Sequence, residues 1–238
     1  MQTQKIQYKN TMKEEQVEKQ NVEINDIITK AEAFIEKYKN TILIVVAAIV
    51  VVVLGYFGLK KWYFEPREKE AAGEMFMAEN YFDNYDYEKA LNGDQTTNAL
   101  GFIDIISDYS GTKTANLARY YAGICELRLG QYEEAIGHLK KYSGKDAYTK
   151  ALAVMAIGDA QSELGDNDEA IKYYEKAAKI GDNDIVAPTA LYKAAILYIA
   201  NQQGDKAVAA LEQIKEKYPQ STEYSEVDKY IAVAESMK

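Results

Sequence analysis

A short phrase of sequence recurs along the second half of the chain at an interval of about 35 residues. It reads LGQYEEAIGHLKK at 129–141 and LGDNDEAIKYYEKAA at 164–178. Alanines at matching points of the phrase stand at Ala99, Ala135, Ala170 and Ala207, with spacings of 36, 35 and 37 residues. A fixed period of this length predicts an array of similar structural units that stack on one another.

Each of the last three repeats has a second small residue twelve positions before its alanine: Gly123, Gly158 and Ala195. Small residues on two helices let the backbones approach closely where the helices cross. Gly130 and Gly165 follow seven residues after the small positions, and glycine suits the left-handed conformation at the end of a helix. The pattern therefore predicts pairs of helices, with the alanine on the second helix of each pair.

This pattern resembles the tetratricopeptide repeat, whose period is 34 residues, most closely over residues 115–219. Pro219 stands at the helix-ending position of that consensus. The first unit is less regular: we expect a helix over 67–84, then a long connection, DYEKALNGDQTTN, before a helix that contains Ala99. A helix over 222–236 should cap the array. The predicted fold class is all-α, a single N-terminal transmembrane helix followed by a tetratricopeptide-repeat α-solenoid of about four helix pairs plus a capping helix.

The run TILIVVAAIVVVVLGYFGL at 41–59 has no charged residue and is long enough to cross a bilayer as a helix. Trp62, Tyr63 and Phe64 follow it beside two lysines, which is typical of the membrane interface. A buried core helix is disfavoured because nothing else in the chain could surround it. A cleaved signal peptide is disfavoured because the run begins 40 residues into the chain and lacks a small-x-small cleavage site.

The segment before the apolar run divides into a polar part and an amphipathic part. Residues 1–20, rich in Gln, Lys and Glu, are expected to lack regular structure. From Ile24 to Tyr38 apolar residues recur at helical spacing, with Asn25 as a possible cap, which fits either an interfacial helix or a docking helix for a membrane partner. The expected domains are a cytoplasmic tail with this juxtamembrane helix (1–40), a transmembrane helix (41–60) and a repeat domain (61–238).

Composition excludes several classes of function. The net charge is −9, and residues 60–238, with 21 basic and 30 acidic side chains, contain all of it, which disfavours nucleic acid as a partner. Cys125 is expected to be a buried, inert thiol and His138 a surface residue, so no metal site is predicted. GHLKKYSGKD at 137–146 lacks the spacing of a phosphate loop and is interpreted as a turn. We expect no catalytic residue, no cofactor and no enzymatic activity.

The first helix of each unit should line the concave face of the array. The side chains expected there are mostly aromatic and aliphatic, which would suit extended or unfolded peptide segments. An acidic outer face that recruits a basic partner is the alternative. The candidate peptide-binding residues are Tyr120, Ile124, Leu127, Met155, Asp159, Tyr192, Ile196 and Ile199.

The segment EAFIEKYKNTILIVVAAIVVVVLGYFGLKKWYF, followed by an Ala/Glu-rich helix and an acidic repeat domain, resembles the YfgM-like family, the ancillary subunit of the bacterial Sec translocon (SecYEG). The resemblance implies a single-pass protein of the bacterial inner membrane, with a cytoplasmic N-terminus and a periplasmic repeat domain. It also implies three kinds of protein partner: the Sec translocon, a periplasmic chaperone of the prolyl-isomerase class and exported client proteins. The charges flanking the apolar run are nearly balanced, so the orientation rests on this resemblance.

Two alternatives stay open. GDKAVAALEQIKEKYPQSTEYSEV at 204–227 is similar to repeats of the outer-membrane assembly lipoprotein and of the cell-division coordinator of the Tol system, which would suit an envelope assembly scaffold unrelated to Sec. The other alternative is a repeat receptor or adaptor that faces the cytosol, as in mitochondrial import. Such receptors hold a carboxylate with Lys and Asn, whereas the central inner positions here are Ile124, Asp159 and Ile196.

Overall fold

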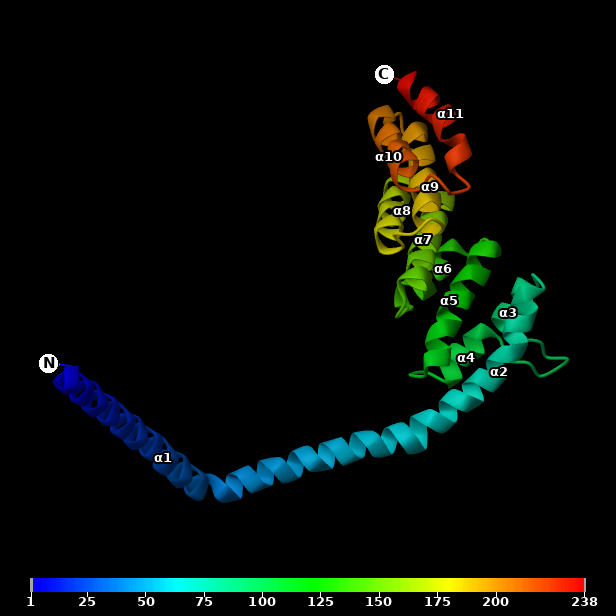
Figure 1. Cartoon of the computed structure of the whole chain (residues 1–238). Helices are drawn as coiled ribbons and strands as arrows, with labels where there is room; N and C mark the ends of the chain where they lie inside the picture. Colours follow the sequence, from blue (N-terminus) through cyan, green and yellow to red (C-terminus); the bar gives the residue numbers. More distant parts are fainter. Residues whose placement is uncertain (1, 238) are drawn as a thin grey trace. The chain divides into compact units, whose positions relative to one another are not determined.

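The computed structural model describes the backbone of residues 2–237. It describes the side chains of residues 29–237, except those at positions 33 and 42. The chain divides into two compact units, residues 1–62 and 63–238. Helix α1, Gln2–Leu59, makes up nearly all of the first unit (Figure 1). The expectation that residues 1–20 lack regular structure is wrong, because α1 is continuous from Gln2. Part of the expected amphipathic face, Ile24 to Ile28, lies outside the described side chains.

The apolar run lies in the last third of α1. It meets the length and hydropathy of a helix that can cross a membrane, and its described side chains are exposed. Five residues in π-helical conformation, Lys60–Phe64, join it to α2, Glu65–Asp83. Trp62 is 82% exposed.

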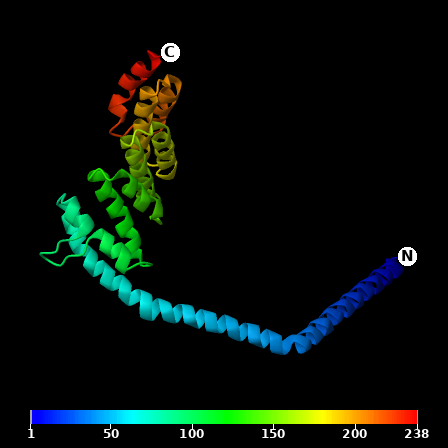
Figure 2. The ribbon, with the colours of Figure 1, turned by 180° about the vertical axis from the view of Figure 1, so that it is seen from behind.

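The second unit is an array of paired helices that stack in chain order, as Figures 1 and 2 show from opposite sides. Three regular pairs follow one another: α5 Lys113–Arg128 with α6 Tyr132–Lys141, α7 Ala147–Glu163 with α8 Asn167–Ile180, and α9 Val186–Ala200 with α10 Gly204–Lys217. Helix α11, Tyr224–Glu235, covers the end of the array and contacts both α9 and α10. The all-α repeat fold with a capping helix is therefore confirmed.

The small residues lie where the sequence places them, at the helix crossings. A Cβ atom added to Gly123 would lie 2.5 Å from Leu139 Cγ and 3.2 Å from the carbonyl oxygen of Ala135. At Gly158 it would lie 2.7 Å from the Tyr174 ring and 3.3 Å from the carbonyl oxygen of Ala170. In these two pairs the helices thus approach so closely that a side chain larger than glycine would require a neighbouring group to shift.

The turns between paired helices are also as expected, with one difference. Gly130 and Gly165 have φ angles of 77° and 81°, the left-handed conformation that ends α5 and α7. In the third pair Gln202 adopts this conformation, with φ 58°. Gly204 instead begins α10, where an added Cβ would lie 2.5 Å from the carbonyl oxygen of Ala234 on the capping helix. The glycine is displaced along the sequence because close packing against α11 requires it there.

The first pair is built differently, and the assignment of Ala99 to a helix is wrong. Ala99 lies in the loop between α3, Tyr87–Asn92, and α4, Phe102–Asp108, where it bridges to Asp94. The residue equivalent to Ala135 is Ala90, fully buried on α3 and twelve residues after the fully buried Ala78 of α2. The second helix of this pair is thus broken into α3 and α4, and DYEKAL begins α3 as QYEEAI begins α6.

Two residues singled out by composition lie on α5 and α6. Cys125 is fully buried, as expected, and burial raises the pKa of its thiol to about 12, which disfavours the reactive thiolate. His138 is not a bare surface residue. Its Nδ1 atom lies 2.8 Å from Oε2 of Glu126, a carboxylate that is only 3% exposed. The histidine supplies the hydrogen-bond partner that a buried carboxylate requires.

Candidate functional site

The inner face of the array is formed by the first helices of the regular pairs. Helices α5, α7 and α9 contact one another in sequence, whereas the second helices α6, α8 and α10 share no such contact within residues 2–237. Because the first helices are closer together, their side of the array is the concave one. All eight candidate residues lie on these three helices, and all are half-buried.

The three candidates on α5 form one group. Tyr120, Ile124 and Leu127 pack against a cluster that includes Leu139 of α6 and Ile157 of α7. The ring of Tyr120 also lies 5.5 Å from that of Tyr142, and burial raises its pKa to about 12. These side chains contribute to the contact between neighbouring units and leave only part of their surface for a ligand.

A second group joins α7, α9 and the cap. Met155 packs against both clusters that hold the last two units together, and Tyr192 and Ile199 each pack against one of them. The Tyr192 ring meets that of Tyr230 on α11 edge to face at 5.3 Å. Ile196 is half-buried on the same helix. Six of the eight candidates therefore belong to two aromatic and aliphatic groups, one on α5 and one on α7 and α9.

Asp159 has a different environment from the other candidates. One of its carboxylate oxygens accepts hydrogen bonds from the Lys193 ammonium at 2.6 Å and from the Tyr174 hydroxyl at 2.8 Å. Burial and the Asp159 charge raise the pKa of Tyr174, which keeps this hydroxyl protonated as a donor. Asp159 and Leu127 also line a polar hollow of about 360 Å³ with Arg128, Glu163 and Lys193. A pair of opposite charges, absent from the sequence prediction, thus interrupts the apolar inner face.

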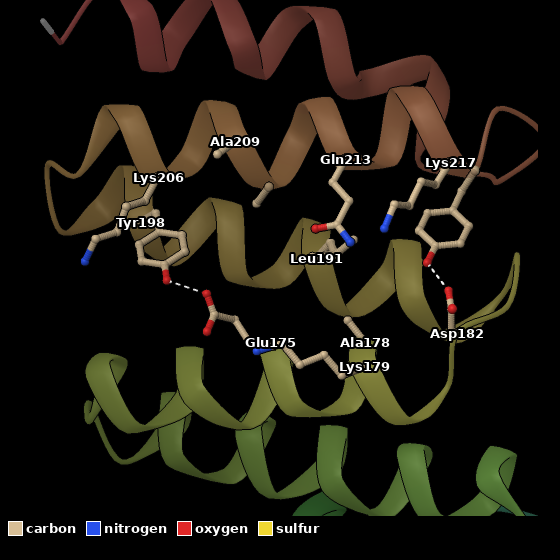
Figure 3. Close-up of a pocket in the computed structure, with 12 residues that line it drawn as sticks. Glu175, Ala178, Lys179, Asp182, Leu191, Tyr198, Lys206, Ala209, Gln213 and Lys217 are labelled. Atoms are coloured by element: carbon tan, nitrogen blue, oxygen red, sulfur yellow. Dashed lines mark hydrogen bonds between the residues drawn. The ribbon is translucent and has the colours of Figure 1, made fainter.

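A second hollow, on the outer side, was not predicted at all (Figure 3). It measures about 530 Å³ and lies between α8 and α10, with Leu191 and Tyr198 of α9 in its lining. We call it the outer hollow. The outer hollow exists because α8 and α10, the second helices of neighbouring pairs, do not contact each other. Side chains of α9 are therefore accessible between them. The other lining residues of the outer hollow are Glu175, Ala178, Lys179, Asp182, Lys206, Ala209, Ala210, Gln213, Lys217 and Tyr218.

The carboxylates of the outer hollow are engaged by tyrosines. Tyr198 donates to Glu175 at 2.7 Å and Tyr218 to Asp182 at 2.5 Å, and Figure 3 shows both bonds. Burial, with a further contribution from Asp182, raises the pKa of Tyr218 to about 12. The three lysines of the outer hollow have no ion pair within the described side chains. The available sequence signal was the spacing of Lys206, Ala210, Gln213 and Lys217, which share one face of a helix.

No group of three or more His, Cys, Asp and Glu side chains is placed to hold a metal ion in the part of the chain that the structure describes.

Comparisons with known proteins agree with this architecture. Two family models, both described as tetratricopeptide repeat, match residues 161–227 and 117–145. Among solved structures, the chain is similar to nearly identical TPR-like repeats from a Podosopora anserina protein described as a kinesin light chain. The TM-score is 0.55 at 15% identity, over 74% of this chain and 89% of that one, which shows a shared fold. No curated protein matches the sequence significantly.

Proposed function

We propose that the inner face of this tetratricopeptide-repeat array binds unfolded or extended segments of other proteins beside a membrane. Tetratricopeptide repeats form scaffolds of the kind that mediates contacts between proteins, and they are typically non-catalytic. The observation that carries the proposal is the row of half-buried aromatic and aliphatic side chains on α5, α7 and α9. An extended segment could place apolar side chains over this row, and side chains that become fully buried on binding dominate the energy of such contacts.

The proposed setting is the bacterial inner membrane, with residues 41–60 as the transmembrane helix, residues 1–40 in the cytoplasm and residues 61–238 in the periplasm. The exposed apolar run of α1 supports the anchor. The Sec translocon, a periplasmic chaperone of the prolyl-isomerase class and exported proteins are the proposed partners, on the strength of the resemblance to the YfgM-like family. Protease added to intact spheroplasts should remove the repeat domain, and full protection of that domain would contradict this topology and favour a receptor that faces the cytosol.

The binding proposal is tested with the full chain in detergent micelles and a reduced, alkylated, permanently unfolded reporter polypeptide. The inner-face variant replaces Ile124, Met155 and Ile196 with Ser, because these side chains make none of the hydrogen bonds of this face. We expect its affinity for the reporter to fall at least tenfold, since the apolar anchors are lost.

The matched control replaces three exposed apolar residues outside this row with Ser: Leu164, Ile185 and Val233, which are 41%, 65% and 39% exposed. It should bind the reporter as the unchanged chain does. Circular dichroism spectra and melting temperatures establish that both variants fold. Reporter binding that survives the inner-face changes but falls steeply with salt would overturn the proposal and favour docking through the outer face.

A further inference from the structure

A group of basic side chains lies in another part of the array, between the start of α5 and the end of α6. These side chains line a hollow of about 710 Å³, which we call the basic hollow. Its charged lining residues are Lys113, Arg119, Lys141 and Lys145, and no carboxylate lines it. Four positive charges without a negative one are unexpected in residues 60–238, where acidic side chains outnumber basic ones by 30 to 21.

The positive charge of the basic hollow is not used within the fold. None of its four basic side chains forms an ion pair in the described part of the molecule. Two carboxylates that border the basic hollow in sequence or through the backbone, Glu68 and Asp146, accept hydrogen bonds from other groups. Glu68 accepts from the backbone N–H groups of Lys113 and Thr114 at 2.6 and 3.0 Å, which occupies the start of α5. Asp146 accepts from the backbone N–H and the hydroxyl of Thr149.

The walls of the basic hollow are held together by hydrogen bonds. The Asn116 side chain donates to the carbonyl oxygen of Ser143 at 3.2 Å and accepts from its N–H and hydroxyl at 3.0 and 3.1 Å. These bonds fix the loop at 142–146 against α5. The backbone of the loop is thereby joined to the start of α5, so a ligand need not order the backbone before it binds. The interpretation of 137–146 as a turn is wrong for residues 137–141, because they belong to α6.

The position of the basic hollow indicates what it meets. The loop before α5 is pinned to the residues that follow the apolar run: a Cβ atom on Gly111 would lie 3.3 Å from the Phe64 ring. Arg67 stacks over the rings of Tyr63 and Tyr109 at 5.2 and 5.7 Å and donates to the carbonyl oxygen of Asp108. Phe64 is only five residues after Leu59, a span of at most about 18 Å of extended chain.

If α1 crosses a bilayer, the short connection from Leu59 to Phe64 keeps the loop before α5 near the lipid headgroups. This holds whatever the orientation of residues 63–238 relative to residues 1–62. The headgroup layer adds about 5 to 8 Å beyond the hydrocarbon core, and charges attract over a Debye length of about 8 to 10 Å. Juxtamembrane lysines and arginines are attracted to anionic lipid surfaces over this range. We propose that the basic hollow docks onto anionic phospholipid headgroups of the bilayer in which the chain is anchored. This inference rests on the anchor of the proposed function and not on its binding face.

The test uses the full chain in nanodiscs of phosphatidylcholine, with or without about one third phosphatidylglycerol, and hydrogen–deuterium exchange as the readout. Exchange of the backbone amides in residues 108–113 and 142–146 should slow at least threefold when the anionic lipid is present. High salt should remove this protection, because the attraction is electrostatic. Inorganic phosphate added to pure phosphatidylcholine discs should give no protection; protection there would overturn the lipid as the source of the anion.

Two variants of equal charge separate a specific site from a general charge effect. The first replaces Lys113, Lys141 and Lys145 with Gln and should lose the protection. The second replaces Lys179, Lys206 and Lys217, the lysines of the outer hollow, with Gln and should keep it. Equal protection in both variants, or none in the unchanged chain, would overturn the inference while leaving the anchor intact. Failure of the chain to enter any nanodisc would instead overturn the anchor, and the inference with it.

Discussion

The first helix pair and the three pairs that follow it use the same close crossing of small residues but differ in how the second helix is built. In the regular pairs it is one helix of 10 to 14 residues, α6, α8 or α10. In the first pair it is broken into α3 and α4, of 6 and 7 residues, around the loop at 93–101. The comparison shows that the close crossing of two small residues is what all four helix pairs share. Beyond that crossing, the second helix of a pair can be interrupted by a loop.

What replaces the missing helical turns in the first pair is an aromatic cluster and a polar loop. Phe102 of α4 stacks on Tyr121 of α5 at 5.2 Å, and Phe82 of α2 meets both rings edge to face. In the loop, Asp94 is 8% exposed and accepts hydrogen bonds from Thr96 and Tyr81. The regular pairs rely on continuous helix instead, so the two designs should respond differently to substitution.

The largest expected effect is at Gly101 in the first pair. An added Cβ there would lie 2.3 Å from both the backbone nitrogen of Gly93 and the carbonyl oxygen of Leu91, and backbone atoms cannot move aside as side chains can. We expect Gly101→Ala to lower the free energy of unfolding by about 3 kcal/mol, at the upper end of overpacking costs. Urea unfolding of the full chain, followed by circular dichroism, measures this change.

The control for that substitution is Gly73→Ala on α2 of the same pair, where an added Cβ meets nothing within 4 Å. It should stabilise the chain by about 0.5 to 1 kcal/mol, because alanine favours a helix interior. If Gly101→Ala left the free energy of unfolding unchanged, the loop at 93–101 could rearrange without cost. The close backbone contact at the break in the second helix would then not stabilise the first pair.

A smaller effect is expected at the crossing of a regular pair. Ala170→Leu adds methylene groups at a fully buried position whose carbonyl oxygen lies against Gly158. Because the neighbouring Tyr174 side chain can shift, we expect a loss of roughly 1–3 kcal/mol, seen as a lower melting temperature. Gly137→Ala on α6, with nothing within 4 Å of the added Cβ, is the matched control and should not lower it. An unchanged melting temperature for Ala170→Leu would show that the crossing is not tightly packed.

The smallest effect is a pH dependence confined to the first pair. Hydrogen bonds from the hydroxyl and backbone N–H of Thr96, then from Tyr81, hold the pKa of Asp94 well below its usual range. A carboxyl group with a lowered pKa stabilises the fold above the unfolded pKa of about 3.9, and that contribution is lost as the pH falls through the folded pKa. Asp94→Asn should therefore unfold at lower urea than the unchanged chain at pH 7.

The difference in urea midpoint between Asp94→Asn and the unchanged chain should narrow as the pH is lowered below about 3.9. Paired urea titrations at pH 7 and at pH 3 would detect this change. An equal difference at both pH values would show that Asp94 contributes through its shape and not through its charge. The same substitution should leave hydrogen exchange in α8 and α10 unchanged, because each unit contacts only its neighbours.

Sequence reasoning succeeded where local pattern decides the structure. The register of Ala135, Ala170 and Ala207 and the left-handed glycines at 130 and 165 follow from spacing. The capping helix follows from the need of a repeat array to cover its last unit. It failed at Ala99, because the inserted loop moves the true crossing residue, Ala90, to 45 residues before Ala135. The similarity of DYEKAL to QYEEAI contained the correct answer, but a search at a fixed period passes over it.

The helices that contain the candidate residues could be predicted from the sequence, and the contacts of those residues could not. Helical position placed eight residues on the first helices, and all eight are there. The pairing of Asp159 with Lys193 joins residues 34 apart on different units, so it depends on side-chain direction across a unit boundary. The outer hollow depends likewise on the spacing between α8 and α10 of neighbouring pairs, and the basic hollow on how the loop after α6 lies against the start of α5. The periodicity of one helix contains neither.

The central claim is that partner proteins meet the inner face of the array. Its most direct test is site-specific photo-crosslinking, with a benzophenone amino acid placed singly at Ile124 and Ile196 on the inner face and at Leu164 and Ile185 as exposed controls. With the unfolded reporter present, we expect crosslinked adducts from the two inner positions and only background from the controls. Adducts that form equally at all four positions, or only at Leu164 and Ile185, would contradict the claim.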